Sequence, residues 1–451
     1  MNINEINKIA YSLIKLLEVK NIVKQKESIE QRKKYIGEQE SVAEFNLKEG
    51  DFFIIYENDI LNNNVAVSAI IKNTEVGLNR ENYQILNKLV EELLINNSYI
   101  NDNCDFEFVE KKLFKWIIEI YSKNKADFDF YDYLMLSIEK EKNDYFFYFK
   151  INDLIIEEAF SLGNCKFTSL DKNFFEARLE EMNQNEVNIS IAEQKDFISL
   201  NKMFLNRVLI AVTFSAVHSK ATIKAMNEVE LSVNALKIFL TFESLTQTSL
   251  FNVDFKDMNN DCFEYFSYNK KGNFNTVIGS KKSTTQPTEV SLRYLKNLKL
   301  KGLEKISKFL KNKKSSELYL EIENLINEYG SINSTPDLRI RIVLLVSYFE
   351  RIIIPKTNLK GKGQAFLKNN ILPKLIANPD EEIANKINRI YRIRDKYLHN
   401  RIELPIDVDS FLVFNDIARI FLLKLVDLNN LNYETLDDVY AYFKIPTSKT
   451  G

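Results

Sequence analysis

The sequence contains few of the residues that break helices or form tight turns. Its 451 residues include only 7 prolines and 11 glycines, which argues against turn-rich β-sandwiches and barrels and favours long helices. The three cysteines, Cys104, Cys165 and Cys262, are scattered along the chain. This set offers neither a disulfide framework nor the paired spacing of a zinc site, so we expect a reducing cytoplasm and no metal site.

Long apolar runs and a strong net charge are also missing. No apolar run reaches the roughly 20 residues of a transmembrane helix, and the start of the chain lacks the basic and apolar regions of a signal peptide. We therefore expect no membrane partner. The formal net charge of −2 gives no overall attraction to nucleic acid, so any RNA contact must come from local patches. The length predicts two to four domains with sizeable cores.

The first 190 residues alternate between helix and strand patterns. Apolar residues at helical spacing predict one long helix over 3–35. Two β-rich runs, 52–56 and 65–71, flank an Asn-rich turn and predict a hairpin. Two further helices and a second hairpin are predicted over 81–96, 106–122, and 145–149 paired with 154–156. We therefore expect an α+β region over 1–190.

Strand patterns give way to helical ones after about residue 194. The predicted helices cover 197–218, 221–245, 289–313, 316–329, 338–354, 364–377, 380–399 and 408–425. Residues 252–290 are irregular, which predicts a surface insertion or a mobile loop. The expected fold class is mainly α, with the α+β region followed by an all-α C-terminal half. The predicted division is 1–190, a helical middle region over 191–335, and a helical domain over 336–451.

One short stretch carries residues suited to phosphodiester cleavage. The sequence has two histidines, and the second, His399, follows Arg394 by five positions, with Asp395 between them. An imidazole moves protons near neutral pH, and a guanidinium fits a phosphate and its developing negative charge. The trio can form a metal-free cleavage site. The other histidine, His218, is expected to be structural.

The segment Arg394-Asp395-Lys396-Tyr397-Leu398-His399 resembles the R-(N/D/H)-x-x-x-H signature of HEPN domains. These are small helical domains, many of which are metal-independent ribonucleases. The residues before the arginine resemble the Apea-like branch, which usually ends its motif in His-Gly, whereas here Asn400 follows the histidine. The resemblance covers residues 336–428, roughly a fifth of the chain, and implies an HEPN-like bundle of four helices.

The resemblance implies an endoribonuclease that leaves 2′,3′-cyclic phosphate and 5′-hydroxyl ends and needs no cofactor. His399 would be the general base or acid, Arg394 would bind the scissile phosphate, and Asp395 would orient the imidazole. Glu350, which ends an apolar helical run, would pair with an arginine of the motif helix; Glu350 and Asn400 are the supporting residues. The alternatives are an ordinary helix-end histidine, a surface arginine paired with Asp395 or Glu350, and an exposed glutamate.

Helix geometry separates the two principal residues. Five helical positions turn about 500°, which leaves Arg394 and His399 about 140° apart around the axis. Either the helix distorts near Leu398, or two copies meet and each site draws residues from both chains. HEPN nucleases generally use the second arrangement, so the resemblance implies a homodimer through the motif helices.

Two basic sets are candidates for RNA contact. The motif helix carries Arg389, Arg392, Lys396 and Arg401. A second run holds nine basic residues between 293 and 314 with Glu304 as its one acid, and interleaves Tyr294 and Phe309. Such a run can track a phosphate backbone, and Lys305 and Lys308 are the predicted contacts. The alternative is a solvated helix face whose leucines and isoleucine are buried, namely Leu295, Leu298, Leu303, Ile306 and Leu310.

The resemblance further implies a role in bacterial anti-phage defence or abortive infection, with tRNA or mRNA as the target. The region 1–190 would then sense a phage-derived trigger or restrain the nuclease. Two alternatives remain. One is a non-catalytic helical scaffold that dimerises or binds RNA or a nucleotide. The other is the toxin half of a toxin–antitoxin pair.

Overall fold

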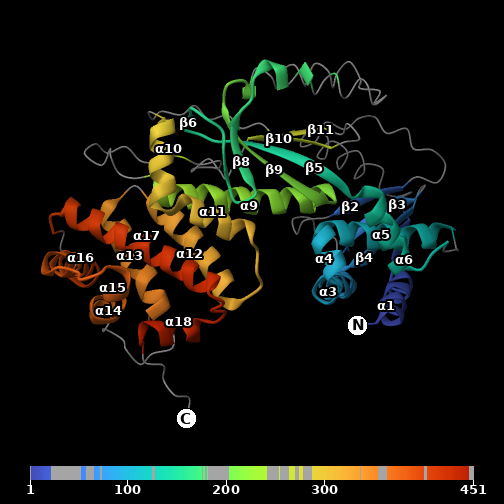
Figure 1. Cartoon of the computed structure of the whole chain (residues 1–451). Helices are drawn as coiled ribbons and strands as arrows, with labels where there is room; N and C mark the ends of the chain where they lie inside the picture. Colours follow the sequence, from blue (N-terminus) through green and yellow to red (C-terminus); the bar gives the residue numbers. More distant parts are fainter. Residues whose placement is uncertain are drawn as a thin grey trace, which may run out of the picture. The chain divides into compact units, whose positions relative to one another are not determined.

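The computed structural model combines two larger sheets, one short strand pair and a set of C-terminal helices in the residues it describes (Figure 1). The described residues are 2–21, 52–56, 65–71, 74–123, 127–174, 176–177, 180, 203–240, 253, 264–269, 274–277, 287–335, 337–353, 363–400 and 404–445. The chain divides into two compact units: unit 1 is Met1–Tyr145 with Phe214–Ile223, and unit 2 is Phe146–Thr213 with Lys224–Gly451.

Unit 1 contains a four-stranded antiparallel sheet and five helices among its described residues. Its elements are α1 (Ile3–Lys15), β1 (Glu18–Asn21), β2 (Phe52–Tyr56), β3 (Val65–Ile71), β4 (Thr74–Asn79), α3 (Arg80–Asn96), α4 (Ser98–Asn103), α5 (Phe106–Lys123) and α6 (Phe130–Glu141). The strand order is β1-β4-β3-β2. Pairing of β2 with β3 confirms the predicted hairpin, and α3 and α5 match the helices predicted over 81–96 and 106–122.

The long helix predicted over 3–35 is wrong. It begins as expected, with the Asn2 side chain accepting a hydrogen bond from the Glu5 amide, but it ends at Lys15. The chain then enters β1, which pairs with β4 from Glu18 opposite Gly77 to Asn21 opposite Thr74. A non-local strand partner therefore overrides a locally helical pattern. Residues 22–35 lie outside the described residues.

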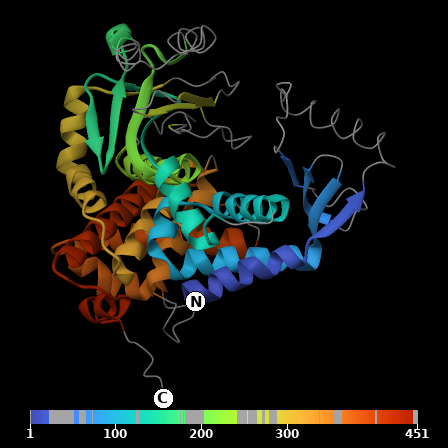
Figure 2. The ribbon, with the colours of Figure 1, turned by 90° about the vertical axis from the view of Figure 1, so that its right-hand side faces the viewer.

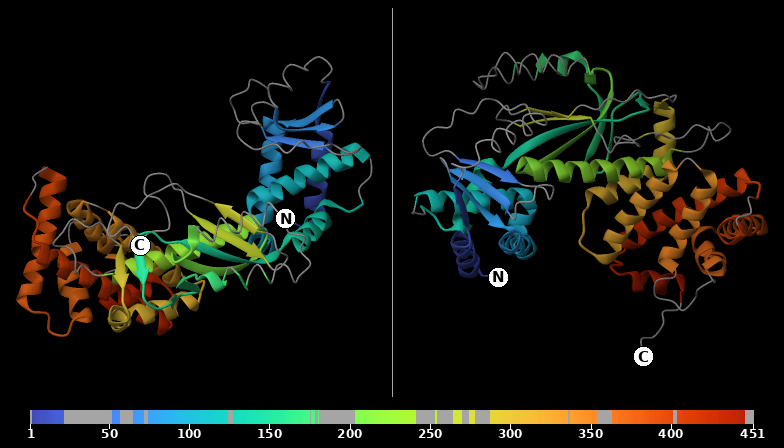
Figure 3. Two further views of the ribbon diagram at one scale, coloured as in Figure 1. Left: turned by 90° about the horizontal axis from the view of Figure 1, so that it is seen from above. Right: turned by 180° about the vertical axis from the view of Figure 1, so that it is seen from behind.

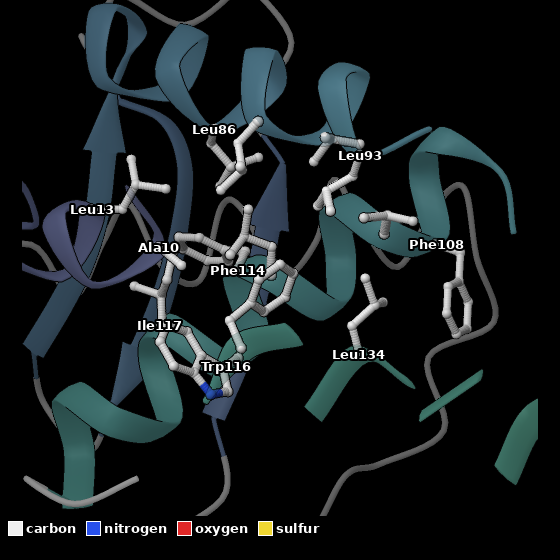
Figure 4. Close-up of a cluster of buried hydrophobic side chains, with 14 of the residues drawn as sticks. Ala10, Leu13, Leu86, Leu93, Phe108, Phe114, Trp116, Ile117 and Leu134 are labelled. Atoms are coloured by element: carbon white, nitrogen blue, oxygen red, sulfur yellow. The ribbon is translucent and has the colours of Figure 1, made fainter. Parts of the chain in front are cut away.

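The core of unit 1 is formed where α1, α3 and α5 meet (Figure 4). Ala10, Leu13, Leu86 and Phe114 have no exposed surface there. Trp116 is also buried, and its indole N–H donates a hydrogen bond to the carbonyl of Phe128 over 3.1 Å. Each large apolar side chain buried in this way contributes about 1.5–3 kcal/mol, so unit 1 has a core of its own.

Unit 2 begins with a six-stranded sheet of order β11-β10-β5-β9-β8-β7. The elements are β5 (Asn143–Lys150), β6 (Leu154–Ile156), β7 (Phe160–Leu162), β8 (Cys165–Ser169), β9 (Val208–Ala216), α9 (His218–Phe239), β10 (Tyr265–Asn269), β11 (Phe274–Val277) and β12 (Thr288–Val290). The ends of β5 and β9 and the first turn of α9 belong to unit 1. Helix α9 runs along one face of the sheet (Figure 3), and the Ser232 hydroxyl donates to the carbonyl of Leu162.

Three predictions for this region are wrong. Residues 208–216, predicted as helix, form β9, because a strand with apolar residues on both faces reads as a continuous apolar run. The irregular insertion over 252–290 contains β10, β11 and β12. The hairpin predicted for 145–149 with 154–156 does not form, because β6 pairs in parallel with β12. Strands thus continue past residue 194, and the helical C-terminal half begins at α10.

The helical middle region predicted over 191–335 is thus wrong as far as β12, and from α10 onward the described chain is helical, as predicted. Its elements are α10 (Leu292–Leu298), the π-helical turn η2 (Lys299–Leu303), α11 (Glu304–Lys311), α12 (Glu317–Ser334), α13 (Leu338–Ile353), α14 (Gly363–Phe366), the turn η3 (Leu367–Ile371), α15 (Leu372–Leu375), α16 (Glu381–Asn400), α17 (Val408–Asn430) and α18 (Leu436–Phe443). The orange and red helices gather into one bundle beside the sheet of unit 2 (Figure 2).

Helix α17 is the centre of this bundle, and it packs against α11, α12, α13, α15 and α16. Phe414 of α17 lies 5.1 Å from the ring of Phe349 on α13 and 6.2 Å from that of Tyr391 on α16, centroid to centroid. These aromatic contacts hold the motif helix against α13 and α17. Among the described residues, no helix has both the length and the apolar character to cross a bilayer.

Candidate functional site

The predicted motif lies on the last turns of α16, an amphipathic helix. The Asp380 side chain accepts a hydrogen bond from the Ile383 amide and caps its start. Ile387, Ile390 and Tyr391 are buried against the bundle, while the opposite face is polar and exposed. This spacing directs the buried side toward α13 and α17 and presents the motif at the surface.

Arg394 is held by two carboxylates from different elements. Its Nη2 lies 3.0 Å from Oε2 of Glu350 on α13, and its Nη1 lies 2.9 Å from Oδ1 of the adjacent Asp395. The predicted pairing of Glu350 with a motif arginine is confirmed. The Glu350 side chain is 18% exposed and that of Asp395 is 53% exposed. The Glu350 pair is therefore the stronger anchor, and solvent weakens the Asp395 pair.

Burial shapes the electrostatics around the Glu350–Arg394 pair. Burial raises the pKa of Glu350, the Arg394 guanidinium opposes this rise, and Asp395 adds to it. Burial also raises the pKa of Tyr391, whose hydroxyl has no hydrogen-bond partner among the described residues. The Nε of Arg394 is likewise buried and unpartnered within the described chain. Arg394 can still offer further Nη–H donors to an anion.

Gly363, the first residue of α14, packs directly on the Glu350 carboxylate. A Cβ atom at position 363 would lie 2.9 Å from Oε1 and 3.1 Å from Cγ of Glu350. Beside it, Gln364 and Lys368 both donate to Oδ1 of Asn388 on α16, over 2.7 and 2.8 Å. The segment around α14 therefore keeps Glu350 turned toward Arg394.

We expect Gly363→Ala to destabilise the native chain by about 1 kcal/mol, because the added methyl group displaces the paired Glu350 carboxylate. In a Glu350→Ala background the same substitution meets no carboxylate and should have almost no effect. Urea unfolding of the four chains gives the coupling energy directly. Equal destabilisation in both backgrounds would show that Gly363 does not act through Glu350.

His399 lies apart from Arg394 on the helix surface. Its side chain is exposed and makes no hydrogen bond to the residues that the structure describes. Helix α16 continues to Asn400, so the distortion considered near Leu398 is not observed, and Arg394 and His399 stay about 140° apart. Asp395 bonds to Arg394, and no described hydrogen bond joins it to His399. The side chain of Asn400 is outside the described part.

The predicted RNA contacts on α16 have different surroundings. Arg389 is exposed, and its Nη1 lies 2.7 Å from Oδ2 of Asp407. Arg392 is exposed without a described ion pair, and Lys396 is half-buried. Arg401 is not among the described residues. Only part of this set is therefore open to a phosphate group.

The second basic set is divided in the same way. Lys305 pairs with Asp427 over 2.8 Å, with both side chains about 40% exposed, and Lys308 pairs with Glu304 over 3.0 Å. Phe309 is buried and its ring stacks on Tyr319 at 4.5 Å. Lys305 is thus engaged in holding α11 to α17, and Phe309 is closed to a nucleic-acid base.

Asp407 links the motif helix to α17 and carries a pH dependence. It accepts hydrogen bonds from the Ser410 hydroxyl and amide and pairs with Arg389. These contacts, the Ser410 hydroxyl first, lower its pKa from the ordinary 3.8 to about 2. The ionised carboxylate is thus favoured by folding. Its stabilisation is present above about pH 4 and lost as the pH falls toward 2.

We expect Asp407→Asn to lower the urea midpoint at pH 6, with a loss of about 0.5–1 kcal/mol, because the amide keeps the cap acceptor but not the charge. The difference between native chain and variant should shrink as the pH falls from 4 to 3. Urea unfolding at several pH values measures it. A difference that stays constant from pH 6 to 3 would contradict the lowered pKa.

Other chemically notable groups lie away from the motif. His218 contacts the Tyr145 ring edge-on at 5.0 Å, and burial lowers its pKa, which fits the predicted structural role.

Two residues near the motif, Gly363 and Asn388, were not predicted from the sequence. The glycines at 361 and 363 were a signal for a close approach of the backbone. Among the described residues, no group of three or more His, Cys, Asp or Glu side chains is placed to hold a metal ion.

Comparison of the chain with protein-family models, curated proteins and solved structures gives no match.

Proposed function

We propose that the chain is a metal-independent endoribonuclease of HEPN type. The observation that carries the proposal is the Glu350–Arg394 ion pair, in which a half-buried carboxylate of α13 holds the arginine of the motif. Glu350 fixes the Arg394 guanidinium, whose Nη1 faces the exposed carboxylate of Asp395. A guanidinium held in this way is suited to binding phosphate. A phosphate would displace Asp395 from Arg394, since that exposed pair is weak.

In the proposed reaction the ribose 2′-oxygen attacks the adjacent phosphorus. A general base removes the 2′-hydroxyl proton, and a general acid protonates the departing 5′-oxygen as the P–O5′ bond breaks. His399 supplies one of these two proton transfers. Arg394 neutralises the charge that develops on the non-bridging phosphate oxygens. The products carry a 2′,3′-cyclic phosphate and a 5′-hydroxyl group.

The separation of Arg394 and His399 on a regular helix supports a site shared between two chains. In this arrangement Arg394 of one chain and His399 of a second face the same phosphate. Leu398, next to His399, is 46% exposed and offers an apolar contact for such a pair of helices. The proposed active form is therefore a homodimer through α16.

The proposed setting is a bacterial cytoplasm, where the nuclease acts against tRNA or mRNA in anti-phage defence or abortive infection. The region 1–190, which includes most of unit 1, would sense a phage-derived trigger or restrain the nuclease. This assignment follows the family resemblance of the motif, and the independent core of unit 1 fits a separate sensing part.

Incubation of RNA with the purified chain in excess chelator tests the proposal. We expect cleavage to persist and the fragments to carry cyclic phosphate and 5′-hydroxyl ends, identified by mass spectrometry. Fragments with 5′-phosphate ends, or cleavage that stops with chelator, would contradict it. The ion pairs of Arg394 would also suit a purely structural role. Binding of RNA or dimerisation without cleavage would therefore favour the alternative of a non-catalytic scaffold.

A further inference from the structure

The segment from α10 to α11 concentrates positive charge in a chain that is otherwise balanced. Residues 293–314 contain nine lysines and arginines and one acid, Glu304, for a formal charge of +8, whereas the whole chain carries −2. Such a segment attracts a polyanion even though the complete protein does not.

The apolar side of this segment is fixed to the bundle, so its charges face solvent. All five apolar residues named in the solvated-face alternative are buried. Gly302 has φ of +111°, and a Cβ there would lie 2.7 Å from a methyl group of Leu423 on α17. Only glycine permits this close turn. The Lys301 carbonyl also accepts a hydrogen bond from Arg419 of α17.

Four of the cations remain available on this fixed surface. Arg293, Lys296, Lys299 and Lys311 are exposed, and none of their side chains has a hydrogen bond or ion pair with the described residues. We call these four residues the basic ridge. Lys308 is adjacent, and its pair with Glu304 joins side chains that are 72% and 61% exposed, so an incoming phosphate competes for it easily.

The basic ridge lacks the aromatic platforms that bind unpaired bases. Proteins that bind single strands stack bases on exposed aromatic rings, but Phe309 is 2% exposed and Tyr294 is only half-exposed. Without exposed rings on which unpaired bases could stack, these cations are suited to contacts with backbone phosphates. Base-paired RNA presents its phosphates outward and is recognised largely in this way.

Helix α17 contacts both the motif helix α16 and α11, which carries Lys311 of the basic ridge. Near its start, Asp409 pairs with Lys386 of α16, and near its end Asp427 pairs with Lys305 of α11. Eighteen residues separate the two aspartates, which corresponds to about 27 Å of helix. The two ends of α17 thus hold the motif helix and α11 in one bundle.

We propose that the basic ridge binds the phosphate backbone of a base-paired RNA segment, and so holds a structured RNA while another part of it reaches the motif. This inference depends on the proposed nuclease function for its biological meaning. It identifies the substrate class as RNA with a base-paired stem, bound without regard to sequence.

The test measures binding by the full chain carrying His399→Ala, so that the RNA stays intact. The probes are a labelled RNA hairpin with a 16-base-pair stem and an unpaired RNA of equal length, followed by fluorescence anisotropy. We expect the hairpin to bind more tightly. A variant in which all four ridge residues are glutamine (Arg293→Gln, Lys296→Gln, Lys299→Gln and Lys311→Gln) should bind the hairpin at least about tenfold more weakly. The slope of log affinity against log salt concentration should become less steep by about 3 to 4.

A matched control removes four positive charges elsewhere. Lys8, Lys88, Lys123 and Lys140 are exposed residues of unit 1 without a described ion pair, and their replacement by glutamine should leave hairpin binding unchanged. Equal losses in both variants, unchanged binding in the ridge variant, or a preference for the unpaired RNA would overturn the proposal. Cleavage by the native chain is assayed separately, so ridge-dependent binding without cleavage would refute only the nuclease function.

Discussion

Arg394→Ala and His399→Ala are each expected to lower the rate of RNA cleavage in excess chelator by at least about 100-fold. Removing a group that stabilises developing charge typically lowers a rate by 10² to 10³, and removing a general acid or base lowers it by 10² to 10⁴. Arg394→Lys should recover little of this rate, because an ammonium lacks the planar fork that the phosphate requires. The measurement is the initial rate of cleavage of a labelled RNA.

Arg351 of α13 provides the matched control for Arg394. It also joins two carboxylates, Glu321 and Glu328, over 3.0 and 2.9 Å, but it lies outside the proposed site. Arg351→Ala should therefore lose a similar ion-pair contribution and still cleave at the native rate. Circular dichroism melting shows whether each variant is folded. Folded Arg394 and His399 variants that cleave like the native chain would remove the HEPN assignment.

The motif helix shows what the sequence can predict well. Its buried residues recur at helical spacing and its start carries a capping aspartate, so the position of α16 follows from local pattern. The Glu350–Arg394 pair was likewise expected, because the resemblance placed a glutamate at the end of the preceding apolar helix. The position of the helix depends on spacing along the chain, which a sequence displays directly, whereas the pair was implied by the resemblance.

Other features depend on partners that are distant in the sequence. Strand β9 has buried residues on both faces, so its composition does not distinguish it from a helix. Strand β6 pairs with β12, where Thr288 lies opposite Leu154, and no local signal selects that partner. Asp395 had two possible partners at permitted spacing, and it bonds to Arg394 because Glu350 holds the guanidinium within its reach. Contacts of this kind are decided by tertiary packing, which local sequence patterns do not display.

Mixing Arg394→Ala chains with His399→Ala chains is expected to restore cleavage to about one quarter of the native rate. If Arg394 of one chain acts with His399 of the other, a mixed dimer holds one complete site and one site that lacks both residues. Random exchange makes about half of the dimers mixed, and each has one of two sites intact. The measurement is the cleavage rate after the two inactive variants have exchanged subunits.

The double variant Arg394→Ala/His399→Ala supplies the control for this restoration. Mixed with either single variant, it provides no missing partner residue, so those mixtures should stay inactive. A site contained within one chain predicts no recovery in any mixture, even when labelled subunits show that mixed dimers have formed. Because α16 is regular through the motif, with Arg394 and His399 about 140° apart, recovery is the outcome that reconciles this geometry with both residues acting on one phosphate.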